Sequence, residues 1–183
     1  MKLIQKPASH TLKIKIAVFF WIVFCNLIVQ GFHHQLEEFG IVAWNLFLVN
    51  VLFFMMEEDP YKERWIKCFC GIIVGLAGVW GLCIVNGALS AAGMPHLAAV
   101  MVPLTLFLAV IIIGGAYCPT VFNNVGFAYF LVGLISPEVT FVHLGTYMLG
   151  GILGNLLING SAILIIQAMI RHFTAKAAKN KPQ

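Results

Sequence analysis

Charge is what this 183-residue chain has least of. Only 10% of its residues are charged, 61% are hydrophobic, and the mean hydropathy is +0.94. These values lie outside the range of soluble globular domains. The composition therefore excludes a soluble core and predicts a membrane protein.

Basic residues are absent from the long apolar stretches. All eleven Lys and Arg residues fall into three clusters, at positions 2 to 15, 62 to 67 and 171 to 181. The first interval between clusters has room for two membrane spans and the second has room for four. An even number of crossings places every cluster on one side, which the positive-inside rule assigns to the cytoplasm. The net charge of +4 is thus an orientation signal, and we expect no nucleic-acid partner.

We therefore expect an all-α, polytopic protein with six transmembrane helices in a single membrane domain, residues 1–183. The predicted spans are residues 16–32, 40–56, 66–88, 97–115, 120–135 and 144–170. The tails, residues 1–15 and 171–183, are expected to be cytoplasmic. No small-x-small site follows the first apolar run before His33, so we expect no cleaved signal peptide.

Sequence patterns of catalysis and redox chemistry are also missing. Among the five cysteines, Cys68-x-Cys70 has the wrong spacing for a redox pair or a zinc site. There is no phosphate-binding loop and no Ser-His-Asp spacing that a short loop could assemble, and no acid lies deep within a predicted span. We expect no catalytic residue, no enzyme activity and no cofactor.

Two parts of the chain resemble each other at an offset of 73 residues. Gly78-x-x-Gly81 with Asn86-Gly87-Ala88 matches Gly151-x-x-Gly154 with Asn159-Gly160-Ser161, and Asn50 and Phe54 match Asn123 and Phe127. Copies separated by three crossings would run in opposite directions, which is the inverted-topology repeat of many transporters. A chance match in a chain rich in Gly, Leu and Val is the alternative, and the sequence leaves both open.

Asparagines within or beside the predicted spans are the second signal. An unsatisfied amide in the membrane costs several kcal/mol, so each must find a partner or water. They predict either hydrogen bonds between helices or the lining of a path for an uncharged polar solute. The candidate path residues are Asn50, Asn86, Asn123, Asn124, Asn155 and Asn159.

Glycine pairs at a spacing of four offer faces for close helix packing. Gly71-x-x-x-Gly75 and Gly150-x-x-x-Gly154 are small-xxx-small patterns. They predict close approach of helices, either within the chain or between copies in a homo-oligomer.

Histidines and acidic residues gather at the predicted outer ends of the spans, where no Lys or Arg lies. An acidic, imidazole-rich mouth could sense pH or bind a metal ion, although nothing in the sequence fixes a metal geometry. Interfacial histidines without such a role are the alternative. The candidate residues are His33, His34, Glu37, Glu38, His96 and His143.

The segments from Trp44 to Ala88 and from Tyr117 to Gly133 resemble the YcdZ-like small bacterial inner-membrane proteins, a family of unknown function. The likeness is carried by a Trp-bearing second span, by the segment from Val79-Trp80 to Gly87-Ala88, and by the Pro119-x-x-Phe122 start of the fifth span. The acidic residues Glu57 to Asp59 and the longer N-terminal region depart from it. The resemblance implies a multi-pass helical protein of the bacterial inner membrane and carries no activity or site residue.

The function predicted from the sequence is a channel or facilitator for a small, uncharged polar solute of the urea, amide or ammonia class, with the lipid bilayer as its surroundings. Two alternatives remain open at this point. One is a substrate-binding membrane subunit of a larger importer, and the other is a non-transporting assembly or sensor protein.

Overall fold

The structure is a computed structural model that describes residues 9–56, 58–135 and 140–179. This part of the chain is all-helical and contains no strand, which confirms the predicted all-α class. The elements are α1 (Ser9–Gly31), α2 (His33–Glu38), α3 (Ala43–Met55), α4 (Tyr61–Ala91), α5 (His96–Tyr117), α6 (Asn124–Leu134), α7 (Phe141–Gly154), the π-helix η1 (Asn155–Asn159) and α8 (Gly160–Lys179). Residues 1–8 and 180–183 of the predicted tails lie outside the described residues.

Four helical stretches in the described part of the chain are long and apolar enough to cross a membrane. They are Thr11–Gly31, Tyr61–Ala91, His96–Tyr117 and Phe141–Ala175, and the last runs continuously through α7, η1 and α8. These helices indicate a membrane-embedded protein. We call the continuous stretch from α7 to α8 the long rod.

The other two apolar helices are short. At 1.5 Å per residue, the 13 residues of α3 and the 11 residues of α6 extend about 20 Å and about 17 Å, whereas the hydrocarbon core is about 30 Å thick. The predicted spans 40–56 and 120–135 therefore contain helices shorter than the spans themselves. The count of six spans stays a prediction.

Local sequence explains where several helices begin. Pro60 and Pro95 stand directly before α4 and α5, where the fixed φ of proline suits a helix start. Before α3, Gly40 turns the chain with a φ of +72°, a conformation that favours glycine.

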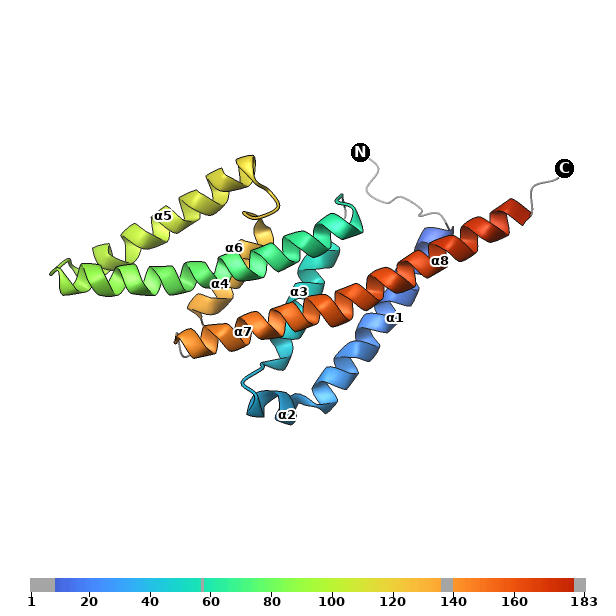
Figure 1. The fold of residues 1–183 in the computed structure, drawn as a ribbon, viewed down its shortest axis with the longest axis horizontal. Coiled ribbons are helices and arrows are strands. Elements are labelled where there is room, and N and C mark those ends of the chain that lie inside the picture. Colours follow the sequence, from blue (N-terminus) through green and yellow to red (C-terminus); the bar gives the residue numbers. More distant parts are fainter. Residues whose placement is uncertain (1–8, 57, 136–139, 180–183) are drawn as a thin grey trace.

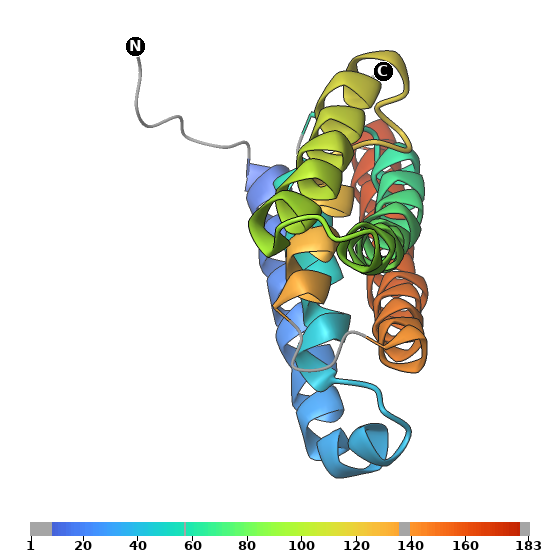
Figure 2. The same ribbon diagram turned by 90° about the vertical axis from the view of Figure 1, so that its left-hand side faces the viewer.

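The centre of the molecule is formed by α4 and the long rod, with α3 and α6 packed against them (Figures 1 and 2). On the flanks, α5 packs on α4 and α1 packs on α8. In Figure 1 the start of α1, the α3–α4 connection and the end of α8 lie towards the right, while α2 and the α4–α5 connection lie at the bottom and the left. The described basic residues therefore belong to the ends of helices that point the same way.

Glycines allow the short helices to approach the long ones. A Cβ atom added to Gly71 of α4 would lie 2.7 Å from the backbone nitrogen of Gly126 in α6. A Cβ atom added to Gly154 of α7 would lie 2.5 Å from the carbonyl oxygen of Leu46 in α3. The predicted close approach at both glycine pairs is confirmed, and it takes place within the chain.

Candidate functional site

Four asparagine side chains are buried in the apolar interior. Asn45 and Asn50 belong to α3, Asn155 and Asn159 are the first and last residues of η1, and each is at most 1% exposed. We call these four residues the asparagine row. Because buried amides cost free energy unless they are hydrogen-bonded, the partners of each one decide what the row can do.

Asn155 is satisfied by its neighbours. Its Nδ2 donates to the Trp65 carbonyl oxygen of α4 at 3.0 Å, and its own carbonyl oxygen accepts from Trp65 Nε1 at 3.1 Å. Its Oδ1 accepts from Asn159 Nδ2 at 3.0 Å. Asn155 therefore ties the long rod to α4, at a π-helical turn of the kind often found at functional sites.

The other three members of the row each keep an unused acceptor. Their Nδ2 groups donate to the carbonyl oxygen of Tyr147 (from Asn45), to that of Leu46 (from Asn50) and to Asn155 Oδ1 (from Asn159). Their Oδ1 atoms are buried and have no hydrogen-bond partner in the described part of the chain. Such acceptors are suited to a molecule that donates N–H or O–H groups.

The three unused acceptors belong to two elements that contact each other, α3 and the long rod. Leu46 of α3 packs on Gly154, Asn45 reaches Tyr147 of α7, and both helices run in the same direction along this contact. Asn50 lies one helical turn beyond Leu46, and Asn159 is the last residue of η1, which also contacts α3. The three acceptors thus come from two elements that contact each other, α3 and η1.

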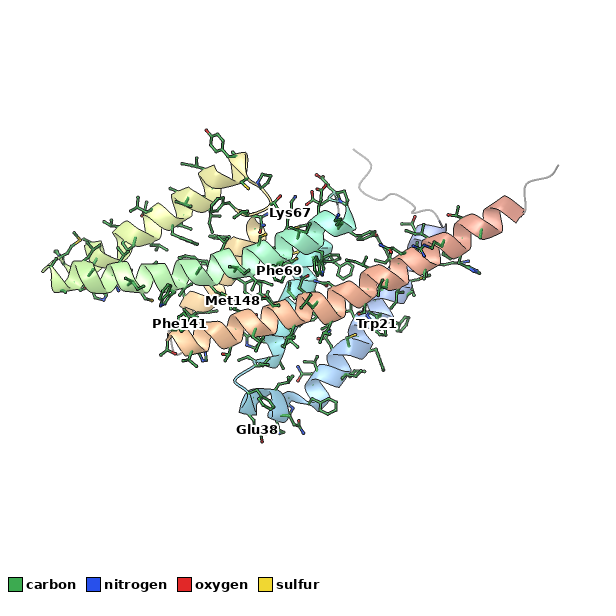
Figure 3. The ribbon with its side chains drawn as sticks, viewed as in Figure 1. Trp21, Glu38, Lys67, Phe69, Phe141 and Met148 are labelled. Carbon is green, nitrogen blue, oxygen red and sulfur yellow. The ribbon has the colours of Figure 1, made fainter. Side chains whose placement is uncertain are left out.

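A cavity of about 550 Å³ reaches the row from the side of α1. We call it the α1–α3 pocket. Its lining is mainly apolar and comes from α1 (Ile14, Lys15, Val18, Phe19, Ile22), α3 (Phe47, Asn50, Val51, Phe54, Met55), α4 (Tyr61, Arg64) and α8 (Ile166). Beyond the pocket, Trp21 Nε1 of α1 donates to Ser161 Oγ of α8 at 2.9 Å and fixes α1 to the long rod (Figure 3).

Basic side chains stand at the α4 end of this pocket. Arg64 is only 8% exposed, donates from Nε to the Asp59 carbonyl oxygen at 2.6 Å, and lies 4.9 Å from the ring centre of Tyr61. Nearby, Lys67 forms an ion pair with Asp59 at 2.7 Å. A buried guanidinium held in this way is positioned by its surroundings, so the charge near the pocket has a fixed place.

Three predicted path residues lie away from the row. Asn123 caps α6: its Oδ1 accepts from the backbone nitrogens of Val125 and Gly126, and its Nδ2 donates to the carbonyl oxygens of Lys67 and Thr120. Asn124 is exposed. Asn86 lies in the last third of α4, where Ser90 Oγ donates to its Oδ1 at 3.4 Å. The structure therefore buries Asn50, Asn155 and Asn159 in two contacting elements, and their role as a solute path stays a prediction.

Asn45 is the member of the row that the sequence analysis did not select. The signal was present, because Asn45 lies five residues before Asn50 within the same apolar segment. The offset of 73 favours Asn50 over Asn45, since Asn50 has an asparagine 73 residues later and Asn45 does not.

The predicted outer histidines and acids do not form one cluster. On α2 the rings of His33 and His34 lie 3.8 Å apart, and Glu37 and Glu38 of the same helix are exposed (Glu38 is labelled in Figure 3). In contrast, His96 begins α5 at the far end of α4. His143 packs on Tyr147 of α7 with ring centres 4.8 Å apart, and its Nε2 is buried without a partner among the described residues. Within the described ranges no three His, Cys, Asp or Glu side chains could hold one metal ion. A pH-sensing role for these residues stays a prediction.

Comparison with known proteins gives no match: no family model, no curated protein and no solved structure resembles the chain significantly. The resemblance to YcdZ-like proteins therefore stays a prediction from the sequence.

Proposed function

We propose that the protein is a membrane channel or facilitator for a small, uncharged solute that donates hydrogen bonds, of the urea, amide or ammonia class. The observation that carries this proposal is the set of three buried, unused Oδ1 acceptors on Asn45, Asn50 and Asn159. A donor-bearing solute that passed along α3 and the long rod would satisfy each acceptor in turn. Amide oxygens carry no net charge, which favours a neutral solute over an ion.

In this proposal the six apolar helices cross the bacterial inner membrane as two inverted repeats, α1–α3–α4 and α5–α6 with the long rod. Each repeat has a long, a short and a long helix. Equivalent helices run in opposite directions in Figure 1, where α4 runs leftwards and the long rod rightwards, and α3 runs upwards and α6 downwards. Such a pair of repeats would place the asparagine row near the bilayer midplane, where transporters bind their solutes.

Glycine contacts give the register of the proposed repeat. Gly75 of α4 packs on the carbonyl oxygen of Gly126, and Gly154 of α7 packs on that of Leu46. Equivalent positions are then 79 residues apart on the long helices (154 minus 75) and 80 apart on the short ones (126 minus 46). In this register Phe130 lies opposite Asn50, whereas the offset of 73 places Asn123 there.

Both termini are cytoplasmic in the proposed topology, because the three basic clusters then lie inside. A homo-oligomer through glycine faces is part of the proposal, but it must use faces that the chain leaves open. Gly81 and Gly87 of α4 have such space, since no heavy atom lies within 4 Å of a Cβ added at either position.

The proposal is tested with the purified chain in liposomes, by following the shrinking and reswelling of vesicles after mixing with urea, acetamide or sodium formate. Urea and acetamide should enter faster than they enter protein-free vesicles, and formate should not. Entry of formate with exclusion of both neutral solutes would contradict the proposal. Activity only after an energising subunit copurifies would favour the importer subunit, and no flux of any solute would favour a non-transporting protein.

A further inference from the structure

We infer that the α1–α3 pocket binds a primary amide with an apolar body, such as a ring or a short alkyl chain. The inference names the solute class of the proposed function and rests on it, because it takes the pocket as the inner entrance to the asparagine row. The ligand's N–H group would donate to Asn50 Oδ1 and its body would fill the rest of the cavity.

The walls of the pocket indicate that the larger part of the ligand is apolar. Large apolar side chains of α1 and α3 supply most of the lining, and the volume of about 550 Å³ lies within the range of about 300–1,000 Å³ that is usual for ligand sites. Urea and ammonia are much smaller than this space and have no apolar part to bury there. An apolar group of several carbon atoms would gain from these walls.

Asn50 indicates that the polar group of the ligand is a hydrogen-bond donor. Its side chain is 1% exposed, and Asn50 is one of the residues that line the pocket. Its Nδ2 donates to the Leu46 carbonyl oxygen at 3.0 Å, and its buried Oδ1 has no partner among the described residues. A buried acceptor of this kind discriminates strongly between ligands that donate a hydrogen bond and ligands that do not.

Charge selects a neutral donor. Lys15 and Arg64 line the pocket. An ammonium group would lie beside these basic residues, and a carboxylate group offers no N–H or O–H donor to Asn50 Oδ1. A primary amide carries N–H donors without either charge.

The opposite flank of the molecule shows that such a cavity is not required by helix packing. Where α5 meets α4 and α6, the ring of Phe107 stacks on Phe130 with ring centres 4.0 Å apart and packs directly over Gly78. In the register of 80 residues, Phe130 corresponds to Asn50. The junction of α5 with α4 and α6 is thus filled by aromatic rings of the protein, whereas the junction of α1 with α3 has the Asn50 amide and a cavity.

The inference is tested by binding to the full chain in lipid nanodiscs, with ligand-observed NMR and three probes of similar shape: benzamide, acetophenone and benzoate. Acetophenone replaces the NH₂ group of benzamide by a methyl group, so the pair isolates the hydrogen bond to Asn50. Benzamide should bind about tenfold more tightly than acetophenone, as expected for a donor that meets a buried acceptor. Benzoate should bind more weakly than benzamide.

Two variants and one matched control locate the site. Asn50→Leu should remove the preference for benzamide, and Asn26→Leu should keep it, because Asn26 makes the same bond to the carbonyl four residues earlier but does not line the pocket. Val51→Trp should fill the pocket and weaken both neutral probes without changing Asn50. Circular dichroism melting shows whether each variant is folded. If Asn50→Leu does not fold, the effect of Val51→Trp on probe binding decides whether the pocket is the site.

Equal binding of benzamide and acetophenone, tighter binding of benzoate, or binding unchanged by Val51→Trp would overturn the inference. The flux assay separates it from the proposed function. Benzamide binding that depends on the pocket, without urea or acetamide flux, would support the binding site and contradict the proposed channel function. Flux that is unchanged in Asn50→Leu and Val51→Trp would support a channel but show that the pocket is not part of its solute path.

Discussion

At the scale of single residues, the same side-chain type has different roles according to its partners. Asn123 and Asn50 are both asparagines beside apolar segments. The Asn123 amide uses its two acceptor and two donor positions on backbone groups at the start of α6, whereas Asn50 leaves Oδ1 unused. Asn123 is therefore a helix cap, and Asn50 has hydrogen-bonding capacity to offer a ligand.

Replacing Asn123 by Ala should lower stability, since the cap of α6 and its link to Lys67 are lost together. Loss of an N-cap costs about 1–2 kcal/mol, which should appear as a lower melting temperature in detergent. Asn124→Ala is the matched control, because Asn124 is exposed at the next position, and its effect should stay within about 0.5 kcal/mol. Equal effects of the two substitutions would show that the cap does not stabilise the protein.

Residue roles could be predicted only in part from the sequence. Apolar surroundings indicate that Asn155 and Asn159 are buried, and their spacing indicates a shared face. The sequence does not reveal that Asn155 forms hydrogen bonds with Trp65, since that contact joins residues 90 positions apart. For Asn123 a signal was available, because asparagine before a helical segment is a preferred cap.

At the scale of helices, glycine determines how closely the short and long elements pack. Gly154 and Gly81 both lie within apolar helices, but only Gly154 meets the backbone of another helix. Gly154→Ala should destabilise the protein by about 1–3 kcal/mol, because the added methyl group forces α3 away from α7. In contrast, Gly81→Ala should be neutral or stabilising, since it has open space and alanine favours the helix. Thermal unfolding of both variants measures the difference, and a Gly154→Ala protein as stable as Gly81→Ala would contradict the close packing.

Helix lengths explain which elements could be predicted from hydropathy. Long apolar runs identify α1, α4, α5 and the long rod, because length and composition are what a membrane span requires. For α3 and α6 the apolar run is longer than the helix. Cys118 to Asn123 follows α5 as turns and an extended cap, although Val121 and Phe122 are apolar. Hydropathy alone cannot distinguish such a turn from a helical one.

At the scale of the whole molecule, charge makes the proposed topology testable. The basic residues near the start of α1, at the start of α4 and near the end of α8 should all face the cytoplasm. A reporter enzyme that is active only outside the cytoplasm should therefore give no signal when it is fused after residue 183. The same reporter inserted between α4 and α5, after Gly93, should be active. A strong signal from the C-terminal fusion would reverse the orientation or remove one crossing.

The overall arrangement could not be read from the offset of 73, because that spacing follows short patterns of Gly and Asn. In the proposed repeat, the contact between α3 and α7 would correspond to the contact between α4 and α6 at 79 to 80 residues, a spacing that comes from the packing. The repeat itself stays a prediction, and the sequence pattern does not define which residues would be equivalent.

The central claim is that unused acceptors of the asparagine row serve a solute, and Asn50→Leu tests it most directly. The substitution removes a buried, unpartnered oxygen, so the melting temperature should stay the same or rise. Urea and acetamide flux into liposomes should fall about tenfold or more, if the lost hydrogen bond is to solute. Asn26→Leu is the control and should keep its flux. Unchanged flux in Asn50→Leu together with a lower melting temperature would contradict the account and leave Asn50 a structural residue.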